Sequence, residues 1–364
     1  MLGVYIHIPF CKSICNYCDF CKINYNQKYI SSYLDSLEKE IKSRYKNELI
    51  DSIYIGGGTP NSLSYQELVR LFNIIKTFKL KDKYEFTIEC NIELIDEDKL
   101  NLFKKNKVNR ISYGIESLNN KIINYLGRTH QKEEVFDKIK LTKKYFSNIN
   151  IDLIYGVNED INILKEDLNN FLKLDITHIS CYSLIIEEHT KLYINKTKPI
   201  NEEIDKSMFD YIHDTLTSNN YKHYEISNYA KEGYESIHNK NYWLNGSYYG
   251  FGLSAVSYLD NYRITNTKNL TKYLNNNYLD NKEYEDIQIR KENDLILGLR
   301  LIDGINVKLF NKKYNCDIIN NVIIKNLLQE KYLIYDQDYL KINYKYIYVS
   351  NNILSKIIGS DLNG

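Results

Sequence analysis

The first half of the chain alternates between two patterns of hydrophobic and polar positions. Short runs rich in β-branched residues are each followed by a longer stretch with helical periodicity. The strand-like runs are residues 4–8, 52–55, 85–89, 110–113, 150–154 and 178–184. The helical stretches are residues 27–45, 64–77, 96–105, 131–145 and 161–172. Strand-then-helix units in succession predict a parallel sheet, because parallel strands need a crossover and a helix usually supplies it.

The predicted fold class is therefore α/β. Chirality and sheet twist favour a partial (β/α)6, TIM-like barrel, although strand order alone leaves an open doubly wound sheet as an alternative. The rhythm ends near residue 226, where Gly- and aromatic-rich loops (227–258) and a polar stretch (275–286) precede a new helix and a β-hairpin. We expect three parts: the barrel at 1–225, an aromatic-rich connecting region at 226–287, and a small α+β domain at 288–364.

Composition narrows the class of protein. The 364 residues carry a net charge of +1 with no long run of one sign, which indicates neither a nucleic-acid-binding stripe nor a polybasic membrane anchor. No apolar run reaches the roughly 18 residues of a transmembrane helix, and no signal sequence is evident. The seven cysteines are an odd number and make a poor disulfide framework. We expect a cytoplasmic protein.

Unusual residues follow the predicted strands. Cysteines come after the first strand, "GGGTP" (56–60) after the second, "ECN" (89–91) at the end of the third and "GIES" (114–117) at the end of the fourth. The fifth strand contains Asp152. Because the carboxyl ends of parallel strands form the active-site face in barrels and open α/β sheets alike, we expect these residues to form one site.

Four cysteines lie within eleven residues, at Cys11, Cys15, Cys18 and Cys21. Structural zinc sites usually pair cysteines across a longer loop, whereas one short loop can wrap an iron–sulfur cluster. The x3 and x2 spacings of the first three, with Tyr17 before the third, resemble the signature of the radical S-adenosylmethionine (SAM) superfamily. Three ligands leave one iron of a 4Fe–4S cluster open, so we expect Cys21 not to be a ligand. A zinc-stabilised structural module is the alternative.

Further segments extend this resemblance over nearly the whole chain. "YIHIPFC", "GGGTP", "NRISYGIES", "LGRTH", "IDLIYG", "YEISNYA" and "HNKNYW", in this order, resemble the oxygen-independent coproporphyrinogen III oxidase-like family. The resemblance implies a partial barrel of radical SAM type that holds a 4Fe–4S cluster and SAM. It implies that the cluster is held by Cys11, Cys15 and Cys18, and SAM by Tyr5, Tyr17, Gly57, Gly58, Thr59 and Glu89. Positions that contact a second SAM in the oxidase are matched by Glu116, Arg128 and Asp152, whose alternative role is a structural ion-pair network.

Two branches of this family differ in function: an oxidase that decarboxylates coproporphyrinogen III and a heme chaperone. Three features favour the chaperone. Only four residues precede Tyr5, Phe20 stands where the oxidase has a fourth cysteine, and "HNKNYW" matches a chaperone segment. The resemblance then implies that heme is cargo, passed to heme-dependent apoproteins, respiratory ones among the candidates, and that an electron donor serves the cluster. No catalytic residue is assigned, and the oxidase is the alternative.

The heme prediction rests on His238, Tyr242 and Trp243. Histidine and tyrosine are known axial ligands of heme iron, and aromatic walls suit a flat macrocycle. A loop anchored by aromatic residues, without a ligand, is the alternative. The chain departs from the family pattern at 157–160, which lacks the usual Pro and Gln, and at Glu116, where Gln is usual.

Overall fold

The computed structural model describes residues 1–360 and residue 362, and its centre is a twelve-stranded sheet. Six neighbouring strands run parallel and match the six that the sequence predicts. They are β1 (Leu2–Ile8), β4 (Leu49–Gly57), β5 (Lys79–Cys90), β6 (Arg110–Glu116), β7 (Asn148–Tyr155) and β8 (His178–Ser183). The sheet does not close on itself within the described residues, since β14 and β9 stand at its two ends. The partial barrel is thus confirmed.

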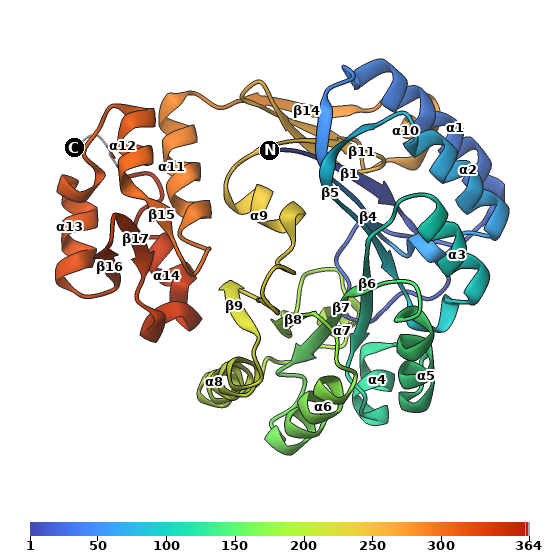
Figure 1. Ribbon diagram of the computed structural model, residues 1–364, viewed down its shortest axis with the longest axis horizontal. Helices are drawn as coiled ribbons and strands as arrows, with labels where there is room; N and C mark the ends of the chain where they lie inside the picture. The colour runs from blue at the N-terminus through green and yellow to red at the C-terminus, as the bar shows by residue number, and fades with distance from the viewer. Residues whose placement is uncertain (361, 363–364) are drawn as a thin grey trace.

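Helices cover the outside of the curved sheet as an arc (Figure 1). The predicted helices are α1 (Gln27–Arg44), α2 (Tyr65–Ile75), α3 (Glu97–Lys105), α5 (Lys132–Thr142) and α6 (Ile161–Lys173). Three more, α4 (Asn120–Leu126), the short α7 (Lys191–Ile194) and α8 (Glu202–Ser218), were not predicted. Local signals set several starts: Ser64 and Glu67 form a reciprocal capping box at α2, and the Asp96 side chain caps α3. None of the described helices is long and apolar enough to cross a membrane.

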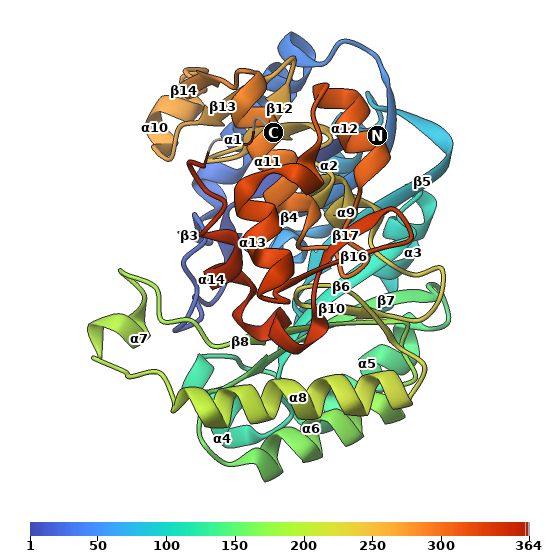
Figure 2. The same cartoon turned by 90° about the vertical axis from the view of Figure 1, so that its left-hand side faces the viewer.

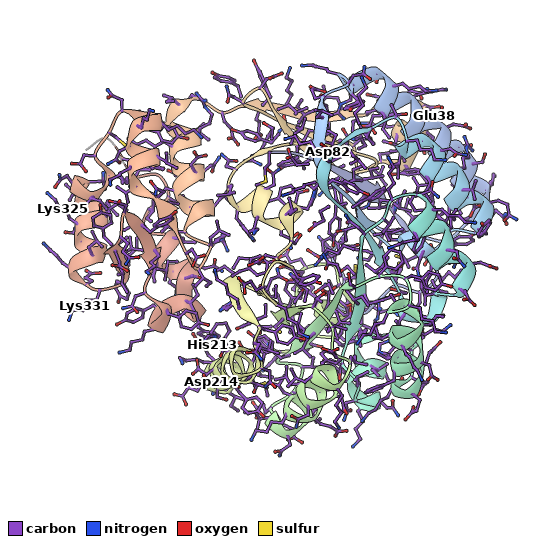
Figure 3. All side chains as sticks on the ribbon, in the orientation of Figure 1. Glu38, Asp82, His213, Asp214, Lys325 and Lys331 are labelled. Carbon is purple, nitrogen blue, oxygen red and sulfur yellow. The ribbon has the colours of Figure 1, made fainter. Side chains whose placement is uncertain are left out.

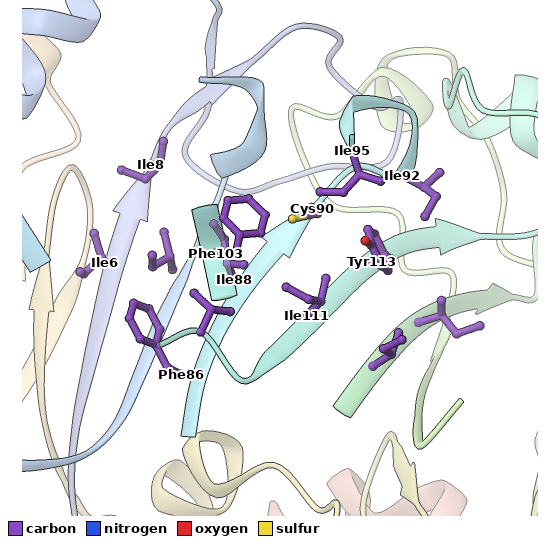
Figure 4. Close-up of a cluster of buried hydrophobic side chains, with 14 of the residues drawn as sticks. Ile6, Ile8, Phe86, Ile88, Cys90, Ile92, Ile95, Phe103, Ile111 and Tyr113 are labelled. Carbon is purple, nitrogen blue, oxygen red and sulfur yellow. The ribbon is translucent and has the colours of Figure 1, made fainter. Parts of the chain in front are cut away.

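The core lies between the strands and this helical arc. Alternate strand residues point outward into it, among them Ile6, Ile88 and Ile111, which are fully buried and belong to the same hydrophobic cluster as Phe103 of α3 (Figure 4). Full burial of such a side chain contributes about 1.5–3 kcal/mol. Charged side chains such as those of Asp82 and Lys325, labelled in Figure 3, are exposed instead.

The loops expected from residue 226 onward are wrong in large part. Four strands of this region extend the sheet beside β1, and the first of them, β11, runs parallel to it. Short strands flank the sheet, and β14, in the polar stretch, exposes all six residues, so no hydrophobic alternation marks it. The elements are β9 (Lys222–Glu225), β10 (Asn228–Ala230), α9 (Ile237–Trp243), β11 (Ser247–Phe251), β12 (Val256–Leu259), β13 (Tyr262–Asn266), α10 (Leu270–Leu274) and β14 (Leu279–Tyr284).

The C-terminal part has a second core, around Leu295, Leu327 and Leu340, and a three-stranded sheet. It stands in front of the main sheet in Figure 2 and is tied to β9 through a bridge between Glu225 and Leu301. The predicted hairpin is present as the last two strands. Its elements are α11 (Ile287–Gly298), β15 (Ile305–Asn306), α12 (Val307–Tyr314), α13 (Val322–Gln329), β16 (Leu333–Asp336), β17 (Tyr339–Ile342) and α14 (Ser350–Leu354). The three-part division at 225 and 287 stays a prediction.

Candidate cofactor and ligand site

The inner face of the barrel is polar. Where a filled barrel would carry layers of Val, Ile and Leu, the inward positions of the parallel strands carry charged, hydroxyl, amide and aromatic side chains. They include Tyr54 of β4, Glu89 of β5, Arg110 and Ser112 of β6, Asn150 and Asp152 of β7, and Ser180 and Tyr182 of β8. Since buried polar groups are costly unless they have partners, this interior is suited to a ligand and not to a solid core.

The cysteine loop stands at the carboxyl end of β1. Two short strands, β2 (Phe10–Cys11) and β3 (Ile23–Asn24), pair in parallel and close the loop between them. Cys11, Cys15 and Cys18 line one cavity of about 130 Å³, whereas Cys21 lines a different cavity. The Thr59 hydroxyl donates to Cys11 Sγ at 3.6 Å, and Arg128 Nη1 donates to Cys15 Sγ at 3.4 Å. Burial raises the pKa of Cys18 to about 11.

These three thiols fit a 4Fe–4S cluster with one open iron, and donors already point at two of the sulfurs. No three His, Cys, Asp or Glu side chains in the described part of the chain are grouped as a single metal ion would require. The thiols that hold a 4Fe–4S cluster lie farther apart than the ligands of a single metal ion, because each thiolate binds a different iron. The two remaining cysteines of the barrel, Cys90 and Cys181, lie in the hydrophobic core, as expected for Cys181.

The glycine loop after β4 lies directly against the cysteine loop. Gly58 donates its N–H to Ile8 O at 2.9 Å, and a Cβ at Gly58 would come within 2.7 Å of Pro9 O and 3.0 Å of Cys11 Sγ. Gly57 has φ +113°, and a Cβ there would meet the His7 ring at 2.5 Å. Only glycine allows this backbone to approach so closely, which leaves its polar groups beside the cysteine cavity.

Glu89 occupies the centre of the site, at the end of β5. Its carboxylate accepts from the Tyr54 hydroxyl at 2.8 Å and from the Gly57 N–H at 3.0 Å. Glu89 borders three cavities: the cysteine cavity, the cavity of about 540 Å³ that Cys21 lines, and a central cavity of about 420 Å³ between the inward side chains of the parallel strands. Burial raises the pKa of Glu89 to about 7. Glu89 does not cap the next α-helix, because the Asp96 side chain caps α3.

Glu116, Arg128 and Asp152 come together beside the cysteine loop. The Glu116 carboxylate accepts from the Tyr17 hydroxyl at 2.6 Å and lies 3.4 Å from Arg128 Nε. Burial raises the pKa of Glu116 to about 7, and the Arg128 guanidinium opposes that rise. Glu116 also has φ +64° at a β-bulge, a strained conformation of the kind that gathers at functional sites. Asp152 accepts from Asn150 Nδ2 at 2.8 Å, and burial raises the pKa of Asp152.

The cysteine cavity thus brings together all but one of the predicted SAM residues. It is lined by Tyr17, Gly57, Gly58, Thr59, Glu89, Glu116, Arg128 and Asp152. The exception is Tyr5, whose hydroxyl lies 2.9 Å from His7 Nδ1 and which borders a neighbouring cavity of about 540 Å³. Glu89 and Gly57 stand between the two cavities. The roles of these residues toward SAM stay predictions.

The predicted heme residues divide between two surroundings. His238 and Tyr242 line the 540 Å³ cavity together with Tyr5 and Tyr54. Both ring nitrogens of His238 are engaged, Nδ1 with Ser52 Oγ and Nε2 with the Tyr242 hydroxyl, each at 2.9 Å. Burial lowers the pKa of His238 to about 3. Axial ligation by this imidazole would require one of these hydrogen bonds to break.

Trp243 borders none of the cavities described above. Its indole lies instead against the C-terminal part, with the Arg300 guanidinium 5.6 Å from the ring centroid. The structure therefore separates Trp243 from the two other residues of the heme prediction.

Three residues of the interior were missed by the sequence analysis. Glu85 of β5 accepts hydrogen bonds from the first residues of α9, Arg110 lines the central cavity, and Arg263 of β13 borders the 540 Å³ cavity. A signal existed for Glu85, because the alternation Glu85, Thr87, Glu89 puts three polar residues on one face of a strand. None existed for Arg263, whose strand was not predicted.

Comparison with known proteins agrees with this geometry. Residues 5–168 match the model of the family described as the Radical SAM superfamily. The fold is similar to that of the coproporphyrinogen III oxidase of Escherichia coli, with a TM-score of 0.86 at 20% identity over 98% of this chain and 90% of the oxidase. The fold is therefore that of a radical SAM protein, a class that implies a 4Fe–4S cluster and SAM.

Relatives with a narrower function are more similar in sequence. The heme chaperone HemW of Lactococcus lactis is 36% identical over 99% of this chain and 98% of its own length, and that of Bacillus subtilis is 34% identical over 93% and 94%. The chain belongs to the HemW family. The predicted preference for the chaperone branch over the oxidase branch is thereby confirmed.

Proposed function

We propose that this protein binds heme and delivers it to heme-dependent apoproteins. The observation that carries the proposal is the 540 Å³ cavity beside the cysteine loop, with walls formed by Phe20, Tyr5, Tyr54, Tyr242 and Tyr248. Its volume lies in the range of sites for large ligands, and a flat, mainly apolar macrocycle is suited to such walls. The names of the relatives point to the same cargo.

In this proposal the cofactors occupy the adjoining cysteine cavity. Cys11, Cys15 and Cys18 hold the cluster, which supplies one electron to SAM when reduced. The thiols must lose their protons to bind iron, and the raised pKa of Cys18 means that cluster assembly displaces a proton there. The Arg128 guanidinium beside Cys15 compensates part of the negative charge that results.

The partners follow from the same proposal. Heme-accepting apoproteins, respiratory ones among them, receive the cargo, and an electron donor reduces the cluster. We place the protein in the cytoplasm.

The first test is anaerobic reconstitution with iron and sulfide, followed by titration with heme. We expect visible absorbance that bleaches on reduction, and a Soret band that saturates with heme. Tyr242→Phe should alter the heme spectrum or affinity, because Tyr242 lines the cavity, whereas Trp243→Phe, a matched aromatic change outside the cavity, should not. Absence of heme binding by the wild type would rule out the proposal.

The oxidase activity is the second candidate, supported by the likeness of the fold to the Escherichia coli oxidase. Incubation of the reduced, reconstituted protein with SAM and coproporphyrinogen III tests it. We expect no sustained turnover. Formation of protoporphyrinogen over many cycles would replace the chaperone proposal with this one.

A further inference from the structure

Arg110 is a buried cation that forms no hydrogen bond or ion pair with the described residues. It is the first residue of β6, points into the barrel and is 2% exposed. Among the described residues no carboxylate lies within 4 Å of its guanidinium and none accepts a hydrogen bond from it, and its Nε is among the buried atoms without a partner. A guanidinium carries five N–H donors and stays charged, so it is seldom buried without acceptors.

The neighbour of Arg110 in the sheet has a buried acceptor that lacks a donor. Asn148 pairs with Arg110 in the register of β6 and β7, and its Oδ1 is also buried without a partner. One water could join these two atoms. The other guanidinium N–H groups have no acceptor among the described residues, and Arg110 borders the central cavity of about 420 Å³.

This cavity has two electrostatically different ends. Arg110 pairs with Thr87 and Asn148, whereas Asp152 pairs with Gly114, four residues and roughly 13 Å further along the strands. The acidic residues of the lining, apart from Glu89 midway, stand at the upper end beside the cysteine loop. They are Asp19, Glu116, Asp152 and Glu187. Ser112, Asn150 and Ser180 lie between the two ends, and Asn150 donates to Asp152 at 2.8 Å. The charge of Arg110 reaches Glu89 and Asp152 and opposes the rise in the pKa of both carboxyls, but neither lies close enough for an ion pair.

We propose that the lower end of this cavity is a carboxylate-binding site and that Arg110 is the residue that binds the carboxylate. The planar guanidinium matches a carboxylate in a two-point contact, and the interior strengthens that contact by excluding water. This inference rests on the proposed function, in which the carboxylate is a heme propionate. The 420 Å³ and 540 Å³ cavities share Phe20, Tyr54, Glu89 and Asn239, so a macrocycle between the tyrosines can extend a propionate toward Arg110.

The carboxylate of SAM is the other source of the same chemistry. A purely structural role, in which Arg110 offsets the charges of Glu89 and Asp152, makes a different prediction. Removal of a structural counter-charge lowers stability, whereas removal of an unpaired buried cation that serves a ligand leaves the ligand-free protein at least as stable.

The test uses the full-length reconstituted protein and the variants Arg110→Met and Arg110→Lys. Arg70→Met, at an arginine on the surface of α2, is the control. Each is titrated with heme, with heme dimethyl ester, whose propionates carry no charge, and with SAM, and the melting temperature is measured without ligand. We expect Arg110→Met to weaken heme binding about 10- to 100-fold, with little change for the ester or SAM, and Arg110→Lys to weaken it less.

The outcomes separate the possibilities. A loss of SAM affinity with unchanged heme affinity would keep the carboxylate site and assign it to SAM. Equal affinities of wild type and Arg110→Met for heme and SAM would overturn the inference, and so would a lower melting temperature with both affinities unchanged. If the wild type binds no heme, the proposed function fails, and the SAM titration then tests the carboxylate site. Weaker SAM binding by Arg110→Met than by the wild type would support the site, whereas equal SAM affinities would overturn it.

Discussion

Glu85 is expected to fix the position of α9, and with it one wall of the large cavity. The Glu85 carboxylate accepts from Ser236 Oγ at 3.0 Å, Ile237 N at 2.8 Å and His238 N at 3.2 Å. Helix α9 has only seven residues, too few to be stable alone. Its orientation therefore depends on this anchor between β5 and the helix.

The magnitude follows from the number of donors that would be left without an acceptor. Each hydrogen bond to a charged acceptor contributes about 1.5–3 kcal/mol when one partner is removed. Glu85→Ala removes these three bonds and a fourth, longer one from Thr87 Oγ1 at 3.4 Å, and because the losses are not additive we expect about 4 kcal/mol. Glu85→Gln keeps one acceptor oxygen but places an amide N–H₂ among existing donors, so we expect about 2 kcal/mol.

Urea unfolding monitored by circular dichroism measures these losses, and heme titration measures the effect on the cavity. We expect weaker heme binding in Glu85→Gln although Glu85 does not line the cavity. Glu38→Gln is the control, since Glu38 forms an exposed pair with Lys42 that contributes about 0.3–0.5 kcal/mol. A loss below about 1 kcal/mol in Glu85→Ala would refute the anchoring role.

Three further predictions concern the cofactor, pH and the glycine loop. Alanine substitution of Cys11, Cys15 or Cys18 should abolish or strongly reduce the iron content after reconstitution, whereas Cys21→Ala should leave it unchanged. An equal loss of iron in Cys21→Ala would contradict a three-ligand cluster. Burial lowers the pKa of His223 to about 4, so between pH 6.5 and pH 4 the unfolded chain takes up a proton at His223 and the folded protein does not. Relative to His223→Gln, the wild type should therefore lose about 2 kcal/mol of unfolding free energy between pH 7 and pH 5. A difference between the two proteins that stays constant with pH would contradict this. Gly57→Ala should cost at least about 3 kcal/mol in the same unfolding assay, whereas Gly233→Ala, also at positive φ but with nothing within 4 Å of the new Cβ, should cost about 1 kcal/mol; equal losses would show that the contact with His7 is unimportant.

The parallel strands and the residues at their ends could be predicted from the sequence because both depend on local pattern. Runs such as 85–89 carry β-branched residues between helical stretches, and the topology then places Glu89 and Asp152 at one edge. Strand β11 could not be found in this way, since its place beside β1 depends on pairing across most of the chain.

The same distinction applies within the site. Period-two alternation indicates which residues face inward, but it does not say which cavity each one borders. Tyr5 and Glu89 both point into the barrel, yet only Glu89 reaches the cysteine cavity. Trp243 was grouped with His238 by sequence proximity, whereas the turn of α9 directs the two side chains to different neighbours.

The pairing of β11 with β1 sets an order of events during synthesis. Tyr5, beside the cysteine loop, pairs with Gly250, so one edge of the first strand has no partner until that residue has been translated. At about 5–20 residues per second, the ribosome needs roughly 10–50 s to reach that point. During this time the cysteine loop is carried by a strand with an open edge, which is accessible to assembly factors and prone to mispairing. Completion of the sheet therefore comes late, and insertion of iron and sulfide can precede it.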